Sequence, residues 1–193
     1  MWERALQTLY SMLQMRGHTL PQLPDMSGLP GDKKCDINFT VENPRLLVYI
    51  SNEKKIGIRT IRVLLAAMES GSHTSALCVF CTQPTPFARR ELAVLQQPTE
   101  AGASKWVELF YTSELKIDIM QHEMVPKHIL LSSSERDAVL AKYQAGMQHM
   151  PKILLTDPVA RYLGLRKDDM VRIERKMSNQ GELPMYRIAA TQS

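Results

Sequence analysis

The stretch RLLVYISNEKKIGIRTIRVLLAAMESGSHTSALCVF, residues 45–80, decides how the first half of the chain folds. Residues 45–50 and 77–80 are short apolar runs, which predict two buried strands. Between them, apolar side chains recur at helical spacing up to a stop at Gly71: Ile58, Ile61, Leu65 and Met68. Strand, helix and strand in this order indicate an α/β layer.

The same layer extends in both directions along the chain. Apolar residues at helical spacing predict an N-terminal helix that stops at Arg16-Gly17: Trp2, Leu6, Leu9 and Leu13. Thr85-Pro86 predicts the start of another helix, because proline at the first helical position loses only a hydrogen bond that lacks a helical partner anyway. Residues 106–110 alternate like a strand. We therefore expect an α/β unit up to about residue 118.

The pattern changes near residue 120. Ser132 and Glu135 have the spacing of a capping box, which predicts a helix over about residues 133–145. A second, shorter helix is predicted by its N-cap, its first-turn proline and its terminal glycine: Asp157, Pro158 and Gly164.

The C-terminal end is expected to be a β-hairpin. Residues 171–174 and 185–189 alternate between apolar and polar types, and residues 178–181 between them are turn formers. The change of pattern predicts two domains, residues 1–119 and 120–193.

Composition excludes several classes of protein. The chain has 193 residues, 44% of them hydrophobic and 23% charged, with a formal net charge of +4. This excludes a wholly disordered chain, and no apolar run reaches the roughly 20 residues that span a bilayer. Residues 1–10 contain charges and no cleavage site, so we expect no secretory signal and a reducing compartment. The weak positive charge predicts that any contact with DNA depends on a partner for most of its affinity.

Motifs for catalysis or metal binding are mostly missing from the sequence. It has no nucleotide-binding glycine loop, zinc-protease motif or serine-hydrolase motif. Cys78 and Cys81 form a C-x-x-C pair, but no second pair exists to complete a zinc site. Their strand-like surroundings predict two buried structural thiols. We therefore expect neither a metal ion nor a cofactor.

One pattern suggests an enzyme. Asp36, on an apparent strand, precedes Glu53 and Lys55, which are the residue types that hold Mg²⁺ and stabilise the attacked phosphate in α/β nucleases. So short a match arises by chance in a chain with this charge content. A solvated loop is the favoured interpretation, and a Mg²⁺-dependent nuclease is the alternative.

Two basic runs are more suggestive of phosphate contacts. The first lies within residues 54–62, which contain no acid: Lys54, Lys55, Arg59 and Arg62. Arg89 and Arg90 form the second, near the start of a predicted helix. Arginines and helix N-termini commonly hold phosphates, although a solvated charged face explains the same residues.

Several segments of the C-terminal domain resemble one known family. His122–His128, HEMVPKH, is similar to the H-E-L-V-P-x-H motif of the fifth common subunit of eukaryotic nuclear RNA polymerases. Residues 150–153 and 157–164 resemble the L-P-R-I and D-P-V-A-R-Y-x-G motifs of that family. Residues 186–188 resemble its terminal Y-R-[LI] motif. The C-terminal domain alone also resembles the corresponding small component of archaeal RNA polymerase.

The resemblance continues upstream, so that it covers nearly the whole chain. Trp2 followed by Arg16-Gly17 is similar to the opening helix of the family. Residues 55–62 resemble its K-V-G-I-K-T-I-K motif, and residues 85–88 stand in the place of its T-P-S-A motif.

The resemblance implies an α+β fold. The N-terminal domain would be a three-layer α/β jaw domain whose core is like that of restriction endonucleases but inactive. The smaller C-terminal domain would be an α/β assembly domain with a mixed sheet.

The resemblance also implies a non-catalytic subunit of nuclear RNA polymerases I, II and III, or a paralogue dedicated to one of them. The assembly domain would dock on the largest polymerase subunit, in contact with other subunits. The jaw would face downstream duplex DNA and contact its backbone. No cofactor, metal or membrane is implied.

Carried over residue by residue, the resemblance implies two sets of site residues. The DNA-proximal set is Thr85, Pro86 and Ala88, with Arg89 and Arg90 as phosphate neighbours. The set that would dock on the largest subunit is Pro126, His128, Asp157, Pro158, Arg161, Tyr162 and Arg187. Structural roles explain part of the second set equally well, because Asp157-Pro158 can cap a helix and Tyr162 can belong to the core.

Some segments depart from the family pattern. Residues 167–171 replace its R-G-x-V-V turn, losing a glycine and adding negative charge, and Phe87 replaces the serine of T-P-S-A. These departures suit a divergent lineage or a specialised paralogue. A free-standing interaction adaptor that kept the fold but left the polymerase is the other alternative.

Overall fold

The computed structural model describes residues 2–20, 36–41, 45–53, 55–95, 106–177 and 181–191. The chain forms two compact units, residues 1–117 and 118–193. None of the helices in these ranges is long and apolar enough to cross a bilayer. Lys54 and the predicted turn residues 178–180 lie outside the described ranges.

The first unit is built on a four-stranded mixed sheet in the order β1-β2-β3-β4. Its strands are β1 (Asp36–Val41), β2 (Leu46–Ser51), β3 (Ser75–Phe80) and β4 (Trp106–Tyr111). β1 pairs with β2 antiparallel, whereas β2, β3 and β4 run parallel, with Leu47, Ala76 and Val107 in register. β2 and β3 are buried along nearly their whole length, as is typical of parallel strands covered on both faces.

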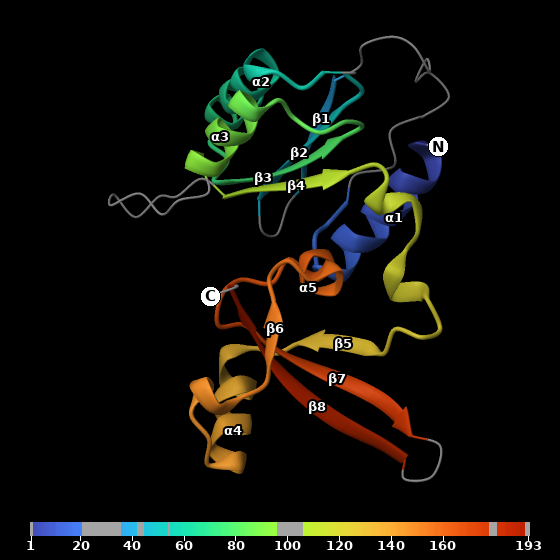
Figure 1. Cartoon of the computed structure of the whole chain (residues 1–193), viewed down its shortest axis with the longest axis vertical. Coiled ribbons are helices and arrows are strands. Elements are labelled where there is room, and N and C mark those ends of the chain that lie inside the picture. The colour runs from blue at the N-terminus through green and yellow to red at the C-terminus, as the bar shows by residue number, and fades with distance from the viewer. Residues whose placement is uncertain are drawn as a thin grey trace. The chain divides into compact units, whose positions relative to one another are not determined.

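Among the described residues, the helices that cover the two faces of this sheet (Figure 1) are α1 (Trp2–Met15), α2 (Ile58–Ser70) and α3 (Pro86–Leu95). On one face, Tyr49, Cys78 and Phe80 pack with Ile61 and Leu64 of α2 and with Leu92 of α3. On the other face, the ring of Phe39 in β1 lies 6.1 Å from the ring of Tyr10 in α1. The expected strands and helices of the first unit are therefore confirmed, and they form three layers.

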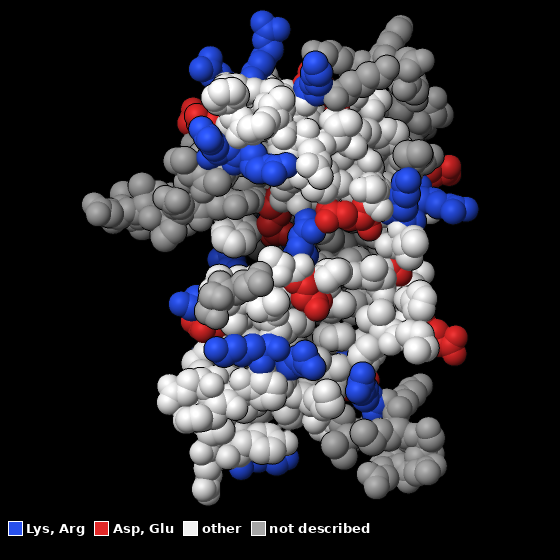
Figure 2. Space-filling model, viewed as in Figure 1, with Lys and Arg blue, Asp and Glu red and all other residues white. Residues whose placement is uncertain are grey.

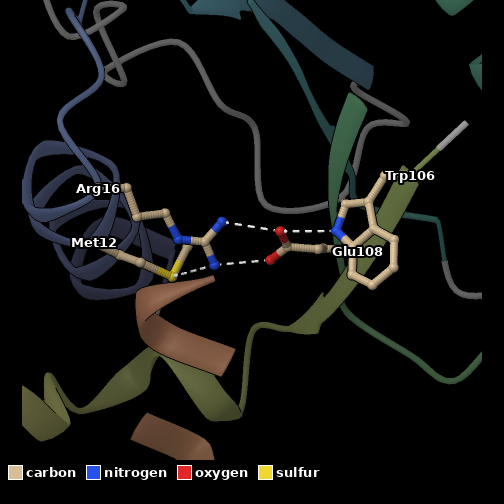
Figure 3. A network of polar contacts seen from close by, with 4 residues as sticks. All are labelled: Met12, Arg16, Trp106 and Glu108. Atoms are coloured by element: carbon tan, nitrogen blue, oxygen red, sulfur yellow. Dashed lines mark hydrogen bonds and ion pairs between the residues drawn. The ribbon is translucent and has the colours of Figure 1, made fainter. Parts of the chain in front are cut away.

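A bidentate ion pair fixes the end of α1 against the sheet (Figure 3). Both terminal nitrogens of Arg16 donate to the carboxylate of Glu108 in β4, over 3.1 and 2.8 Å. The indole nitrogen of Trp106 donates to the same carboxylate over 3.2 Å. Only 7% of the Arg16 side chain and 18% of the Glu108 side chain are exposed. The residue that pairs in register with Glu108 on this face is the apolar Leu77. The carboxylate therefore lies beside an apolar neighbour.

The expectation of two buried thiols is only half right. Cys78 is fully buried in β3, and burial, together with the nearby charge of Glu108, raises the pKa of its thiol. Cys81 lies one residue beyond the end of β3 and is only partly buried, with its Sγ 3.2 Å from Oδ1 of Asn52. The sequence pattern failed here because the strand ends before the second cysteine.

The second unit contains another four-stranded mixed sheet, in the order β5-β7-β8-β6. Its strands are β5 (Lys127–Leu130), β6 (Lys152–Leu154), β7 (Met170–Met177) and β8 (Gly181–Ala190). β5 and β8 both pair antiparallel with β7, and β6 pairs parallel with β8. The expected hairpin is therefore confirmed by the β7–β8 pairing.

The helices of the second unit begin and end close to where the sequence predicts. They are α4 (Ser133–Tyr143) and α5 (Pro158–Leu163). The described residues of the chain also include the 3₁₀ turns η2 (Glu114–Lys116), η3 (Ile119–Gln121) and η4 (Met147–His149). Ser132 and Glu135 form the predicted capping box. The backbone N–H and the hydroxyl of Ser132 both donate hydrogen bonds to the carboxylate of Glu135, and these bonds lower the pKa of that carboxyl. β5 and β6 were not predicted, because four and three residues are too few to show a periodicity.

The turn that departs from the family pattern holds a strained residue. Asp168 has φ +70°, in the left-handed region where a side chain is disfavoured and glycine is not. The adjoining backbone is tied down, because Asp168 N–H donates to the carbonyl of Ala189 over 3.0 Å. The structure thus shows a left-handed position in the segment where the family has a glycine.

We predict that Glu108→Ala lowers the free energy of unfolding of the first unit by about 3 kcal/mol, because it removes the carboxylate that neutralises the buried guanidinium of Arg16. The double variant Arg16→Met with Glu108→Leu should recover most of this loss, because no charge then remains buried. Urea unfolding followed by tryptophan fluorescence measures this unit specifically, since Trp2 and Trp106 are the two tryptophans of the chain. Glu3→Ala, at an exposed position of α1, is the control. Equal stability of Glu108→Ala and the control would contradict the assigned role.

We predict that Asp168→Gly raises, and Asp168→Ala lowers, the free energy of unfolding of the second unit, each by up to about 1 kcal/mol. The reason is that glycine relieves the left-handed strain, whereas alanine lacks the polar side chain that makes the conformation tolerable. Amide hydrogen exchange in β7 and β8 measures the change. If both variants shift protection in the same direction, backbone strain at this position is not the cause.

Candidate docking site in the second unit

One face of the β7–β8 hairpin carries the core of the second unit. Val171 and Ile173 of β7 share this face with Met185 and Ala189 of β8. Ala160 and Leu163 of α5 pack on it, together with Ile153 of β6. Arg175 and Arg187 follow the same alternation, so they stand on the core face rather than on the opposite one.

Where α5 no longer covers this face, a cavity of about 250 Å³ remains open, which we call the docking pocket. Its apolar lining comes from the hairpin, from α5, from β6 and from the loop before β5: Met124, Val125, Pro126, Ile153, Val159, Ile173 and Met185. Its polar lining consists of His128, Asp157, Arg175 and Arg187. The pocket therefore joins an apolar floor to a predominantly cationic rim.

The start of α5 forms one wall of the pocket. Asp157 is the N-cap, and its Oδ1 accepts a hydrogen bond from the N–H of Val159 over 2.8 Å. Pro158 occupies the first helical position, and Gly164 ends the helix with φ +67°. Because the cap fixes the first turn, Asp157 and Val159 are held together at the edge of the pocket.

The loop before β5 forms another part of the pocket lining. The N–H of Val125 donates to the carbonyl of His122 over 2.9 Å, and the N–H of Met124 donates to Nδ1 of His122 over 3.2 Å. Nδ1 of the buried His128 donates to the carbonyl of Pro126 over 2.7 Å. Both histidines thus shape the loop, in which Met124, a lining residue of the pocket, is 82% exposed.

The two arginines of the pocket are not neutralised within the described part of the chain. Neither Arg175 nor Arg187 has a carboxylate within ion-pair distance among these residues. Glu174 lies on the opposite face of β7, where it pairs with Arg172 over 3.1 Å and with Lys127 over 3.8 Å. Asp157, the acid of the pocket, is engaged as a helix cap. A docked segment with a carboxylate would therefore meet two available guanidinium groups.

The structure brings part of the sequence-derived docking set together. Pro126, His128, Asp157 and Arg187 line the pocket. Pro158 is exposed outside its lining, Arg161 is half-buried, and Tyr162 is buried in the core. Sequence analysis missed Arg175, which lies one residue beyond the predicted strand residues 171–174; its two-residue spacing from Ile173 was the pattern that could have identified it.

The DNA-proximal set of the first unit surrounds the start of α3. Pro86, Arg89 and Arg90 line a shallow hollow of about 550 Å³ with Gln83 and Pro84. Arg89 donates to the side-chain oxygen of Gln83 over 3.0 Å. The N–H of Thr85 donates to the carbonyl of Ile56, and Ala88 is fully buried, so the side chain of Ala88 is not available for contact.

Two residues of the nuclease alternative, Asp36 and Glu53, belong to the same end of the sheet. Asp36 pairs in register with Ser51, which places the backbone of Asp36 at the same end of the sheet as Glu53. The carboxylate of Glu53 accepts a hydrogen bond from the hydroxyl of Thr60 in α2, and Lys55 is exposed. Within the described residues, no group of three His, Cys, Asp or Glu side chains could hold a metal ion.

Comparison with known proteins identifies relatives across both units. Residues 117–189 match the family described as RNA polymerase Rpb5, C-terminal domain. The "DNA-directed RNA polymerases I, II, and III subunit RPABC1" of Caenorhabditis elegans is 31% identical over 144 residues, and the Caenorhabditis briggsae protein of that name gives the same values. These matches cover 75% of this chain and 65% of each relative, so the chain spans a little under two thirds of their length.

A relative in Dictyostelium discoideum is covered more fully. Its "DNA-directed RNA polymerases I, II, and III subunit rpabc1" is 32% identical over 143 residues, which are 74% of this chain and 71% of that protein. The family match includes every residue that lines the docking pocket. This chain therefore belongs to the Rpb5 (RPABC1) family of DNA-directed RNA polymerase subunits.

Proposed function

We propose that this chain is a non-catalytic subunit of a nuclear DNA-directed RNA polymerase, shared by polymerases I, II and III or dedicated to one of them. The observation that carries the proposal is the similarity to three RPABC1 proteins, each named as a subunit of polymerases I, II and III. We propose a nuclear location on the same ground. We further propose that the first unit acts as the jaw domain and the second as the assembly domain.

The second unit would dock on the largest polymerase subunit through the docking pocket. Its floor offers Ile173 and Met185, which can bury an apolar side chain of the partner. Arg175 and Arg187 can pair with a neighbouring carboxylate, and such a pair gains strength when docking removes water from it. The combination of an apolar centre with a charged rim is the usual composition of a specific protein interface.

The first unit would lie beside downstream duplex DNA and contact its backbone. Arg89 and Arg90 are exposed on the first turns of α3 and are the proposed phosphate contacts. Such contacts are independent of base sequence and weaken with salt, because binding releases the cations condensed on DNA. The small net charge of the chain, +4, fits an accessory grip within a larger complex.

No observation favours the nuclease alternative over this proposal. The Glu53 carboxylate serves the start of α2, and the described residues form no metal-binding group. The adaptor alternative differs from the proposal only in its partners, so the association of the chain with polymerase decides between them.

We predict that Arg175→Glu combined with Arg187→Glu lowers the recovery of the largest polymerase subunit with the tagged chain at least about tenfold. Charge reversal would repel the proposed carboxylate of the partner, and repulsion within an interface costs several kcal/mol. The measurement is quantitative mass spectrometry of affinity-purified tagged chain from nuclear extract.

The matched control is Lys142→Glu combined with Lys152→Glu, which makes the same charge change at exposed positions outside the pocket. Circular dichroism of each purified variant establishes that the fold is kept. If wild-type chain recovers no polymerase subunit, the proposed function is wrong. If the pocket variant recovers as much as its control, the docking surface lies elsewhere.

We predict that Arg89→Ala combined with Arg90→Ala shortens the lifetime of polymerase–DNA complexes at low salt, about threefold or more, without reducing incorporation of the subunit. Each lost phosphate contact removes a modest, salt-dependent contribution. Dissociation of labelled duplex from purified complexes measures the lifetime, with Arg4→Ala and Lys116→Ala as a matched double control. An unchanged lifetime at low salt would remove these two arginines from the proposed DNA contact.

A further inference from the structure

The outward face of α2 has no role in the function proposed above. Five of its residues line a hollow of about 620 Å³, which we call the α2 face: Ile58, Arg59, Arg62, Val63 and Ala66. They follow the three- and four-residue spacing that puts side chains on one side of a helix. The opposite side of α2, with Ile61 and Leu64, packs into the core of the first unit.

The α2 face exposes aliphatic surface. Ile58 is 37% exposed and Val63 is 47% exposed, although residues of this type are usually buried. Ala66 lies one turn beyond Arg62 and Val63 and contributes a single methyl group to the lining of the hollow. An apolar side chain of a partner that entered the hollow would therefore contact Val63 and Ala66, and its apolar surface would be removed from water.

The α2 face carries positive charge that a partner can neutralise. Arg59 and Arg62 have no hydrogen-bonded or ionic partner within the described residues. The hydrogen bond from Thr85 to Ile56 brings the start of α3, with Arg89 and Arg90, beside the start of α2. Figure 2 shows Lys and Arg side chains gathered over the part of the first unit where Figure 1 shows α2 and α3.

Aliphatic side chains between arginines distinguish this face from a surface that only holds phosphates. DNA backbone contacts require cations and hydrogen-bond donors, and Ile58 and Val63 supply neither. An amphipathic peptide helix with acidic residues beside its apolar stripe is complementary to both the aliphatic side chains and the arginines of the face. Its apolar side chains fill a groove, which is a common mode of peptide recognition, and its carboxylates meet the guanidinium groups.

We propose that the α2 face is a docking site for an acidic, amphipathic helix of a protein partner. One apolar side chain of that helix occupies the hollow over Val63 and Ala66, and carboxylates on either side pair with Arg59 and Arg62. The site belongs to the first unit and shares no residue with the docking pocket, so it stands whether or not the docking pocket binds the largest subunit.

The test uses the full chain with labelled methyl groups and a synthetic probe peptide of about 14 residues, roughly four helical turns. The peptide carries leucines three and four residues apart, flanked by Glu and Asp. A second peptide has the same composition in an order that spreads the leucines around the helix. NMR titration follows the methyl signals of Ile58, Val63 and Ala66, and polyglutamate and a short DNA duplex are titrated in parallel.

The amphipathic peptide is expected to shift these methyl signals and to bind at least about tenfold more tightly than the reordered peptide. Ala66→Leu fills the hollow without changing charge, and it should weaken binding about tenfold. Arg59→Ala combined with Arg62→Ala should weaken binding and reduce its salt dependence, whereas Arg4→Ala, exposed on α1, should leave both unchanged.

Two outcomes would overturn the proposal. One is that both peptides and polyglutamate bind equally well and Ala66→Leu has no effect, because the face would then act through charge alone. The other is that the DNA duplex shifts the same methyl signals while the amphipathic peptide does not, which would make the face a nucleic-acid contact.

Discussion

The ion pair between Arg16 and Glu108 is the constraint on which the first unit depends. A parallel sheet needs cover on both faces, and Glu108 places a carboxylate in the face that α1 covers. Burial of that carboxylate is tolerated because a guanidinium and an indole N–H satisfy it from two sides. The pair therefore fixes where the C-terminal end of α1 lies, since another placement would separate the buried guanidinium of Arg16 from the carboxylate of Glu108. Gly17, with φ +82°, then turns the chain away from the helix.

Each unit leaves part of its own apolar surface uncovered, and in each case arginines border the gap. In the second unit, the short helix α5 does not cover the whole core face of the hairpin, and the half-buried Met185 lines the open pocket with Arg175 and Arg187. In the first unit, α2 turns Val63 and Ala66 outward between Arg59 and Arg62. A gap of this kind costs solvation free energy in an isolated chain, and docking regains it. Both gaps therefore suit a protein that acts within a larger assembly.

The departures from the family pattern have different structural consequences. Asp168 occupies a left-handed position where glycine would be unstrained, so this chain tolerates a local cost that the rest of the turn holds in place. Phe87 replaces a small hydroxyl residue, and its ring is solvent-exposed on the first turn of α3. The first departure concerns the stability of the second unit, whereas the second alters the chemistry of a surface beside Arg89 and Arg90.

The sequence by itself determined where most helices begin and end, because caps such as Asp157, Ser132 and Gly164 act within one turn of the chain. It also determined the long apolar strands, and its motifs identified four residues that line the docking pocket. It could not determine β5 or β6, whose few residues become strands only by pairing with β7 and β8. Only the tertiary structure decided that Arg16 meets Glu108, that Arg175 joins the pocket and that Tyr162 belongs to the core. Those outcomes depend on strand register and on which helix covers which face, and contacts between residues far apart in the chain have no periodicity to reveal them.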